Sequence, residues 1–176
     1  KDKAPKLEDI AIDVGMTKEQ AEKVISLGDL VVLEGFFSKL SGSRVCTPAS
    51  DDRAGVAVIL YALDLLKEEK DLPFRLAVQF SAQEEVGCRG AKIAAFNVDP
   101  DYAIAFDVSF AVSKGVSSEQ AGQLGKGPMI GISPVLCREV SDSLIRIAKE
   151  KNIPYQTEVM SGSTGTNADS IVLTKG

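Results

Sequence analysis

The most constraining feature of the sequence is the alternation of short apolar runs with amphipathic segments from about residue 54 to the end. Residues 74–80 and 102–106 are apolar runs of strand length, and the second is near-continuous, as in strands buried on both faces. Around them, apolar residues recur at helical spacing. This order favours an α/β fold, a three-layer sandwich with a parallel or mixed sheet.

The pattern predicts individual elements along the chain. We expect helices at residues 54–69, 90–96, 133–152 and 168–173, and a short helix after Thr17. We expect strands at residues 7–14, 30–37, 74–80, 102–106 and 155–160, and loops at 115–128 and 161–167. The first 34 residues lack the alternating rhythm, so residues 1–34 and 35–176 are expected to belong to different structural parts.

Composition excludes several classes of partner. The chain has 176 residues, the size of one domain, with 20 basic and 25 acidic residues and a net charge of −5. It has no Lys/Arg cluster that would bind nucleic acid and no apolar run near the ~20 residues of a membrane span. Three scattered cysteines do not make a disulfide framework, so we expect reduced thiols and a cytoplasmic protein.

The chain contains no histidine. This excludes Ser-His-Asp and Cys-His catalysis by this chain alone, and it removes the commonest metal ligand. The chain begins at Lys1 without Met and stops at Gly176 directly after an apolar run, so we expect it to be cut at both ends.

Acidic residues follow three of the predicted elements. Asp51 and Asp52 open the first strong helix, Glu84 and Glu85 follow the run 74–80, and Asp107 follows the run 102–106. Ligands of open α/β sheets bind outside the carboxyl ends of the strands. The positions therefore suggest a common site.

Each residue also has a simpler interpretation. Asp51 could be a helix N-cap, Glu84 and Glu85 a solvated pair, Asp107 a turn cap and Arg53 a surface cation. These alternatives stay open, although they do not explain why every carboxylate lies at the end of an element. If the carboxylates do cluster, their repulsion requires a cation, and two divalent metals bridged by one carboxylate would activate water. A further carboxylate would then act as general base.

Several motifs resemble those of the glutamyl, deblocking or tetrahedral aminopeptidases, metallopeptidases also labelled endoglucanases or cellulase M. The most specific is residues 81–91, Ser-Ala-Gln-Glu-Glu-Val-Gly-Cys-Arg-Gly-Ala, which resembles the family's S-x-Q-E-E-V-G-x-R-G-A. Residues 50–55, 105–109 and 125–128 are similar to its D-D/N-R-x-G helix start, D-V-T strand end and G-K-G-P loop. Residues 10–15 and 28–29 resemble the last strands of its inserted dimerisation domain.

The resemblance implies a zinc-peptidase fold and a role for each carboxylate. Asp51 would bridge two divalent metals, zinc or cobalt with manganese as a third candidate, and Glu85 and Asp107 would each bind one of them. Glu84 would be the general base, and Asp52 and Arg53 would support the site. The substrates would be peptides with a free N-terminus.

The resemblance also implies what this chain lacks. The family's two remaining ligands are histidines, one before the inserted domain and one near the C-terminus, and neither segment is present. Residues 1–34 would be the end of the dimerisation domain and 35–176 the central part of the catalytic domain, in a family that forms homo-oligomers, dimers assembling into dodecamers. The family's G-T-D-A loop reads Gly165-Thr166-Asn167-Ala168, so Asn167 departs from the usual Asp in an expected substrate loop.

Two other functions compete with the metalloaminopeptidase. A metal-free glycoside hydrolase needs two carboxyls facing each other across a sugar-sized cleft, and neighbours such as Glu84 and Glu85 diverge on an extended segment. The chain has no Trp and only 6% aromatic residues to stack against sugars. A non-catalytic fragment serving in binding or assembly is the third interpretation, because two of five expected ligands are missing.

Overall fold

The computed structural model describes residues 4–117 and 121–175, and the chain divides into two compact units, Lys1–Phe36 and Phe37–Gly176. The boundary between structural parts expected after residue 34 lies close to this division. In the first unit, a single-turn 3-10 helix, η1, spans Leu7–Asp9, and α1 spans Lys18–Ala21.

The sequence correctly predicts how α1 begins. Thr17 accepts a hydrogen bond from the Gln20 backbone, and Gln20 Oε1 accepts one from the Thr17 N–H, 3.0 Å away. This reciprocal pair is a capping box. The strands expected at 7–14 and 30–37 are wrong: the described residues there pair with no other segment, and a strand without a ladder partner has no hydrogen bonds to hold it.

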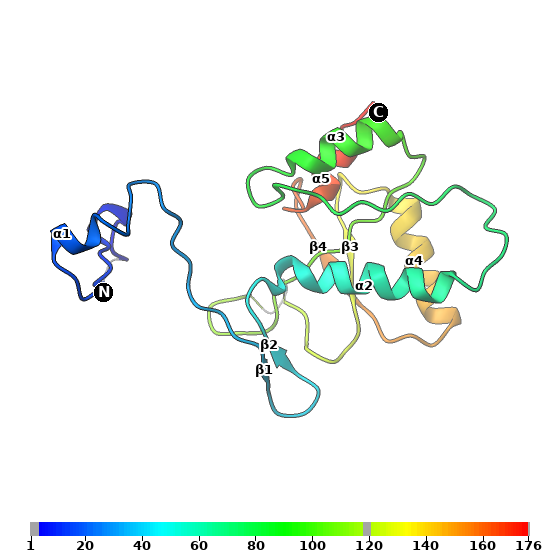
Figure 1. The fold of residues 1–176 in the computed structure, drawn as a ribbon. Helices are drawn as coiled ribbons and strands as arrows, with labels where there is room; N and C mark the ends of the chain where they lie inside the picture. The colour runs from blue at the N-terminus through cyan, green and yellow to red at the C-terminus, as the bar shows by residue number, and fades with distance from the viewer. Residues whose placement is uncertain (1–3, 118–120, 176) are drawn as a thin grey trace. The chain divides into compact units, whose positions relative to one another are not determined.

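The second unit contains four helices and four short strands among its described residues (Figure 1). In chain order these are β1 Ser38–Lys39, β2 Val45–Cys46, α2 Ser50–Leu66, α3 Arg89–Val98, β3 Met129–Ile132, α4 Arg138–Glu150, β4 Gln156–Val159 and α5 Asn167–Ile171. β1 and β2 pair antiparallel, whereas β3 and β4 pair parallel, with Met129 opposite Gln156. From β3 to α5 strand and helix alternate as expected, whereas α3 follows α2 with no strand between them in the described chain.

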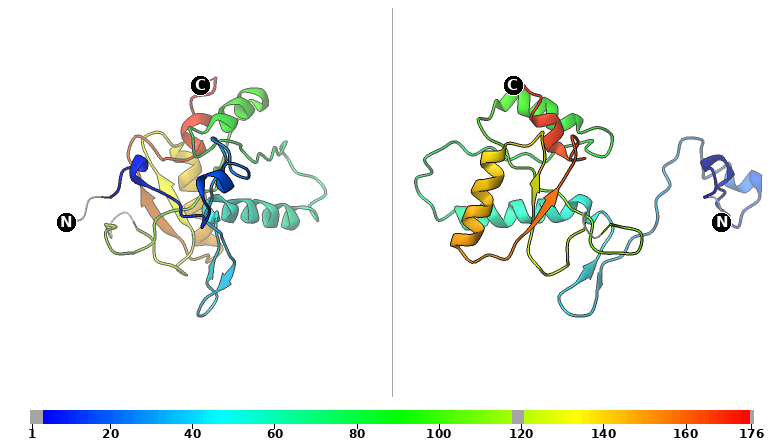
Figure 2. Two further views of the ribbon diagram at one scale, coloured as in Figure 1. Left: turned by 60° about the vertical axis from the view of Figure 1, so that its left-hand side comes forward. Right: turned by 180° about the vertical axis from the view of Figure 1, so that it is seen from behind.

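The β3–α4–β4 segment is the best-packed part of this unit. Two parallel strands need a crossover connection, and α4 supplies it and packs on β3 (Figure 2). The Ser141 hydroxyl donates to the Gly131 carbonyl at 2.8 Å, and Ile130 and Ala148 are buried. Separately, α3 packs against α5 through buried Ala91 and Ala95.

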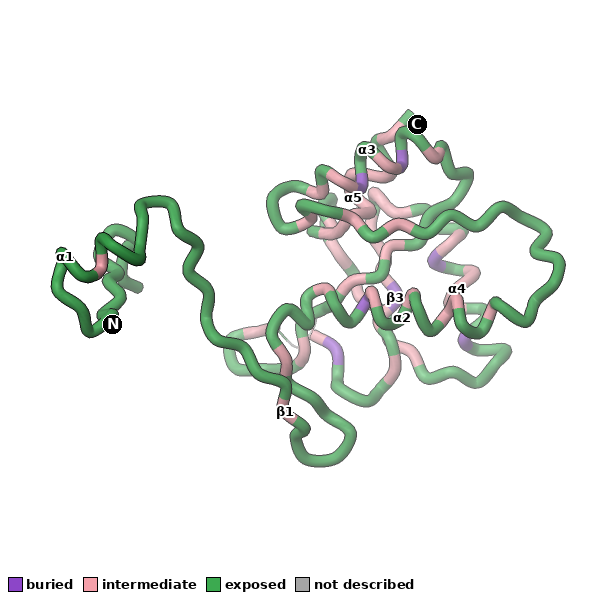
Figure 3. Tube along the Cα trace, viewed as in Figure 1, coloured by how far each residue is buried: buried purple, intermediate pink, exposed green. Residues whose placement is uncertain are grey.

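Two of the predicted strands in this unit are not formed. Residues 74–80 and 102–106 pair with no other described segment, and their apolar side chains are exposed, with Phe74 at 58% and Ile104 at 53% (Figure 3). The expectation that 102–106 is buried on both faces is therefore wrong. Their composition is suited to a sheet interior, but no neighbouring strand or covering layer reaches them in the described chain.

The remaining differences lie near β3. The helix expected at 133–152 begins only at Arg138, because Pro134 lies in a turn closed by the Leu136 N–H on the Ser133 carbonyl. The sequence missed β3, which has four residues and directly follows a glycine-rich loop. The loop expected at 115–128 lies partly outside the described residues. In the described part of the chain, no helix has both the length and the apolar character that a membrane span requires.

The packing of α3 yields a test of the fold. A Cβ at Gly90 would lie 2.7 Å from the Ala82 nitrogen, so Gly90→Ala should lower the free energy of unfolding by about 1–3 kcal/mol, more than the helix propensity that alanine adds. Gly162→Ala is the control, because its Cβ would meet no atom within 4 Å. Urea unfolding measures both; equal effects would contradict the close approach at Gly90.

Candidate functional site

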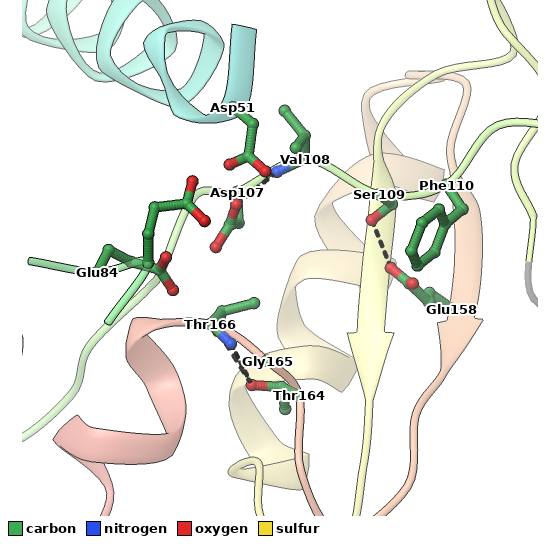
Figure 4. Close-up of a pocket in the computed structure, with 11 residues that line it drawn as sticks. Asp51, Glu84, Asp107, Val108, Ser109, Phe110, Glu158, Thr164, Gly165 and Thr166 are labelled. Carbon is green, nitrogen blue, oxygen red and sulfur yellow. Dashed lines mark hydrogen bonds between the residues drawn. The ribbon is translucent and has the colours of Figure 1, made fainter. Parts of the chain in front are cut away.

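The four expected site carboxylates, Asp51, Glu84, Glu85 and Asp107, line one pocket of about 290 Å³ within the second unit (Figure 4). They come from three segments far apart in the sequence: the start of α2, the turn before α3 and residues after 102–106. The other residues that line it are Val108, Ser109, Phe110, Glu158, Thr164, Gly165 and Thr166.

Asp51 lines the pocket from the start of α2, where the backbone is irregular. Ala49 adopts the left-handed conformation, and Asp51 and Asp52, joined by a cis peptide bond, have non-helical backbone angles. Asp52, not Asp51, caps the helix, since its Oδ1 accepts a hydrogen bond from the Gly55 N–H at 2.8 Å. Because Asp52 occupies that role, the capping interpretation of Asp51 loses its support.

Gly55 is needed for this arrangement. A Cβ at that position would lie 2.7 Å from Asp52 Oδ1, so only glycine leaves room for the capping carboxylate. Arg53 is exposed, and it takes part in none of the ion pairs found among the described residues.

Glu84 and Glu85 lie in a tight turn, not on an extended segment. The Glu84 carbonyl accepts from the N–H groups of Gly87, at 3.0 Å, and Cys88, at 2.9 Å. Gln83 and Cys88 have positive φ, as does Gly87 at +108°. The expectation of an extended segment here is therefore wrong, and both glutamates line the pocket.

A thiol contacts one of these carboxylates. The Cys88 Sγ–H donates a hydrogen bond to Glu84 Oε1 at 3.4 Å. Burial, and then the hydrogen bond and negative charge of Glu84, raise the pKa of the Cys88 thiol to about 11. Cys88 therefore remains a neutral donor to Glu84 at physiological pH.

Electrostatics shows that the carboxylates interact. Burial, together with the negative charges of Asp52, Glu84 and Asp51, raises the pKa of Asp107 to about 6, although the Val108 N–H donates to its Oδ1. Burial and the charges of Asp51 and Glu84 also raise the pKa of Asp52. Burial is the largest cause in both residues, and the neighbouring carboxylates add to it because like charges disfavour ionisation.

The loop that closes one side of the pocket is held by a residue the sequence analysis missed. The Asp169 carboxylate accepts hydrogen bonds from the Thr164 N–H and hydroxyl, the Ser163 hydroxyl and the Gly165 N–H, at distances from 2.7 to 3.1 Å. Burial acts against ionisation, but these hydrogen bonds together lower the pKa of Asp169. Four donors converging on one carboxylate fix the loop beside the carboxylate cluster.

Two of the three residues expected in a substrate loop lie in the pocket wall. Gly165 and Thr166 line the pocket, and Thr166 also caps α5 by accepting from the Ala168 N–H at 3.1 Å. Asn167 is not among the lining residues, and its Oδ1 is buried without a hydrogen-bond partner. Asn167 thus carries an unpaired acceptor directly after the pocket loop.

The oxygen atoms of the pocket are chemically suitable ligands for a divalent cation, but their spacing is not that of a closed metal site. Carboxylate oxygens are ligands for zinc and for harder divalent ions, and no Lys or Arg among the described residues lines the pocket to offset them. However, no three His, Cys, Asp or Glu side chains in residues 4–117 and 121–175 stand close enough together to hold an ion. The pocket thus offers suitable ligand atoms, but they lie farther apart than the donors of a closed coordination shell.

The sequence analysis also missed Ser109, Phe110, Thr164 and Glu158. A signal existed for Glu158, because alternation along the predicted strand 155–160 places it on the same face as Gln156. A signal also existed for Asp169, an acidic residue in the first turn of a helix after a Ser/Thr/Gly loop.

Comparison with known proteins places this site in context. The family model for M42 glutamyl aminopeptidases matches residues 1–176. The chain is 35% identical to the lysyl aminopeptidase of Pyrococcus furiosus over 91% of its own length and 46% of that protein. It therefore spans about half the length of this relative.

Solved structures of peptidases also resemble this chain. A TET aminopeptidase from a marine sediment Thaumarchaeota archaeon superposes with a TM-score of 0.83 and 32% identity, over 96% of this chain and 49% of that one. The TET1 peptidase of Pyrococcus horikoshii, which can assemble into a tetrahedron or a large octahedral shell, gives a TM-score of 0.66 and 31% identity over 89% of this chain and 47% of that one. The expected α/β fold of the zinc-peptidase type is confirmed by these neighbours.

The hydrogen bonds to Asp169 predict a pH-dependent contribution to stability. Its folded pKa lies below 3.8, so the contribution is fully present above that value and is lost as the pH falls through the lower, folded pKa. Asp169→Asn places an amide N–H against these donors. It should lower the free energy of unfolding by about 1–3 kcal/mol at pH 7.

Urea unfolding at pH 7 and at about pH 3 tests this. The difference between wild type and Asp169→Asn should shrink at the lower pH, because the carboxylate of the unfolded wild-type chain then takes up a proton that the folded state disfavours. Asp142→Asn is the control: it removes an exposed ion pair with Arg138 and should change stability by less than about 1 kcal/mol. Equal effects of the two changes would contradict the role given to Asp169.

The raised pKa of Cys88 predicts its reactivity. In metal-free protein, a thiol reagent should modify the exposed Cys46 and Cys137 first and Cys88 at least about tenfold more slowly, because the thiolate is the reactive form. Glu84→Gln removes the nearby charge and should accelerate Cys88 labelling, whereas Glu85→Gln should not. Unchanged labelling in Glu84→Gln would contradict the Cys88–Glu84 contact.

Proposed function

The chain belongs to the M42 glutamyl aminopeptidase family, and on this basis we propose that the full-length gene product is a metal-dependent aminopeptidase. The observation that carries the proposal is the convergence of Asp51, Glu84, Glu85 and Asp107 on one pocket. The activities named for the family and for the Pyrococcus furiosus relative, removal of N-terminal glutamyl and lysyl residues, support the same reaction class.

In this proposal, three carboxylates hold two divalent metal ions. Asp51, whose side chain enters from the irregular start of α2, would bridge the ions, and Glu85 and Asp107 would each hold one. When bound, such ions lower the pKa of water and polarise a carbonyl oxygen. Zinc and cobalt are the first candidates and manganese the third, since carboxylate-rich sites accept several metals. The negative charge that raises the pKa of Asp107 is what a cation would neutralise.

Glu84 is proposed as the general base because it lies in the same pocket and is not needed as a ligand. The Cys88 thiol already donates to its Oε1, which leaves Oε2 to take the proton of the attacking water. Glu84 then returns this proton to the leaving amine, as a group that acts first as base and then as acid. Asp52 and Arg53 are proposed to support the site, Asp52 by holding the backbone that carries Asp51.

The substrate is proposed to be a peptide with a free N-terminus. The loop Thr164–Thr166, which Asp169 fixes, would form the wall against which the first residue of the peptide lies. Gly165 and Thr166 belong to the substrate loop expected from the sequence, and Asn167 follows them directly.

Assembly and location are part of the proposal as well. The TET1 peptidase of Pyrococcus horikoshii assembles into closed shells, and on that likeness we propose a homo-oligomer. Residues 1–34 are proposed to come from a dimerisation domain and 35–176 from the catalytic domain. A cytoplasmic location fits the three free cysteines.

Substitutions in the full-length gene product separate the proposed roles. Glu84→Gln should keep most of the metal and lose about 10²–10⁴ in hydrolysis rate, because the amide cannot accept the proton. Asp51→Asn should weaken both metals, whereas Glu85→Gln and Asp107→Asn should each weaken mainly one. Metal content by mass spectrometry and cleavage of aminoacyl-p-nitroanilides measure the two effects.

Glu68→Gln is the matched control, since Glu68 is exposed after the end of α2 and outside the pocket. If Glu84→Gln stripped the metals while Glu85→Gln left them bound, the two glutamates would have exchanged roles. If the wild-type protein cleaved a glucan and no aminoacyl substrate, the glycoside hydrolase interpretation would replace the proposal.

A further inference from the structure

One carboxylate of the pocket has no role in the proposed metal chemistry. Glu158 lies on β4, and Figure 4 shows it beside Phe110, on the side of the pocket away from Glu84. The pocket volume of about 290 Å³ is near the lower end of small-ligand sites, about 300–1,000 Å³. A pocket of this size suits the single N-terminal residue of a peptide.

The direction of Glu158 follows from the strand that carries it. Gln156 and Glu158 are half-buried on one face of β4, and Thr157 and Val159 are exposed on the other. The Gln156 amide Nε2 donates to the Gly127 carbonyl at 3.0 Å, which ties this face of the strand to the neighbouring loop. Glu158 is therefore held at the pocket wall by the register of β4, not by a mobile loop.

The Glu158 carboxylate keeps an oxygen free for a ligand. The Ser109 hydroxyl donates to Oε2 at 2.5 Å, which fixes the orientation of the carboxylate. No hydrogen bond to Oε1 is found among the described residues. No Lys or Arg of the described chain lines the pocket, so this charge has no cation beside it there.

The neighbouring aromatic ring completes a surface suited to one type of side chain. Phe110 is 69% exposed and borders the same pocket as Glu158. The aliphatic stem of Lys or Arg packs well against a ring, and its charged head interacts favourably with both a ring face and a carboxylate. An acidic side chain in the same place would meet Glu158 as a like charge, and a neutral one would leave it unpaired.

We infer that Glu158 is a specificity-determining residue that, with Phe110, selects Lys or Arg as the N-terminal residue of the peptide. The inference rests on the proposed aminopeptidase function. The α-amine and the scissile carbonyl lie toward the carboxylate cluster, and the side chain extends to Phe110 and Glu158. The charge pair would act mainly through substrate binding, because the side chain is remote from the bond that breaks.

The test compares Lys-, Arg-, Leu- and Glu-p-nitroanilide with wild-type and Glu158→Gln full-length protein. Wild type should cleave the Lys and Arg substrates with the higher kcat/KM. Glu158→Gln keeps an acceptor for Ser109 but no charge, so kcat/KM should fall about 10- to 100-fold for Lys and Arg and stay within about twofold for Leu. This fall in kcat/KM should come from a higher KM, with kcat little changed. Glu150→Gln, on the exposed end of α4, is the control and should leave kcat/KM unchanged for the Lys, Arg and Leu substrates.

A binding measurement keeps the inference separate from the proposed function. Calorimetry with lysinamide and leucinamide should show tighter binding of lysinamide to wild type and no preference in Glu158→Gln. If the Lys-to-Leu ratio were the same in wild type and Glu158→Gln, Glu158 would only brace Ser109 and the inference would be overturned. If no aminoacyl substrate were cleaved, the proposed function would fail, and equal binding of the two amides would then overturn the inference as well.

Discussion

Repulsion among like charges is the constraint on which the rest of this site depends. Asp51, Glu84, Glu85 and Asp107 share one small pocket, and the described residues place no Lys or Arg in its wall. Burial, and then the charges of its neighbours, raise the pKa of Asp107 to about 6, so ionising all of these groups is costly in the absence of a cation. Such a cost is what a bound divalent ion would offset, and it explains why the carboxylates line a common space without closing into a coordination shell.

Hydrogen bonds around the pocket hold these charges in place. Asp52 accepts from the Gly55 N–H and so sets the start of α2, and the carbonyl of Glu84 accepts from two N–H groups that shape its turn. The Asp169 carboxylate accepts from Thr164 and Gly165 and so fixes the loop across the pocket. None of these contacts uses the acidic groups that face the pocket centre. Most of the structural hydrogen bonds thus come from other residues, although Asp107 accepts from the Val108 N–H and Glu84 from the Cys88 thiol.

The sequence predicted the convergence of the carboxylates better than it predicted the sheet. Carboxylates placed directly after apolar runs indicated a common edge, and the turn after residue 80 depends on local signals such as Gly87 at φ +108°. Strands at 74–80 and 102–106 were expected from composition, but a strand needs a partner, and pairing is a property of distant segments that no local pattern contains. Local signals existed for Glu158 and Asp169, but the partner that orients Glu158, Ser109, lies 49 residues away in the sequence.

Anomalous scattering from crystals of the full-length gene product grown with Zn²⁺ tests the central claim most directly. The account predicts two metal peaks in the pocket, with Asp51 between them, Glu85 beside one and Asp107 beside the other, and Glu84 close by but bound to neither. Density that showed no metal in the pocket, or metals bound by residues other than these three carboxylates, would contradict it.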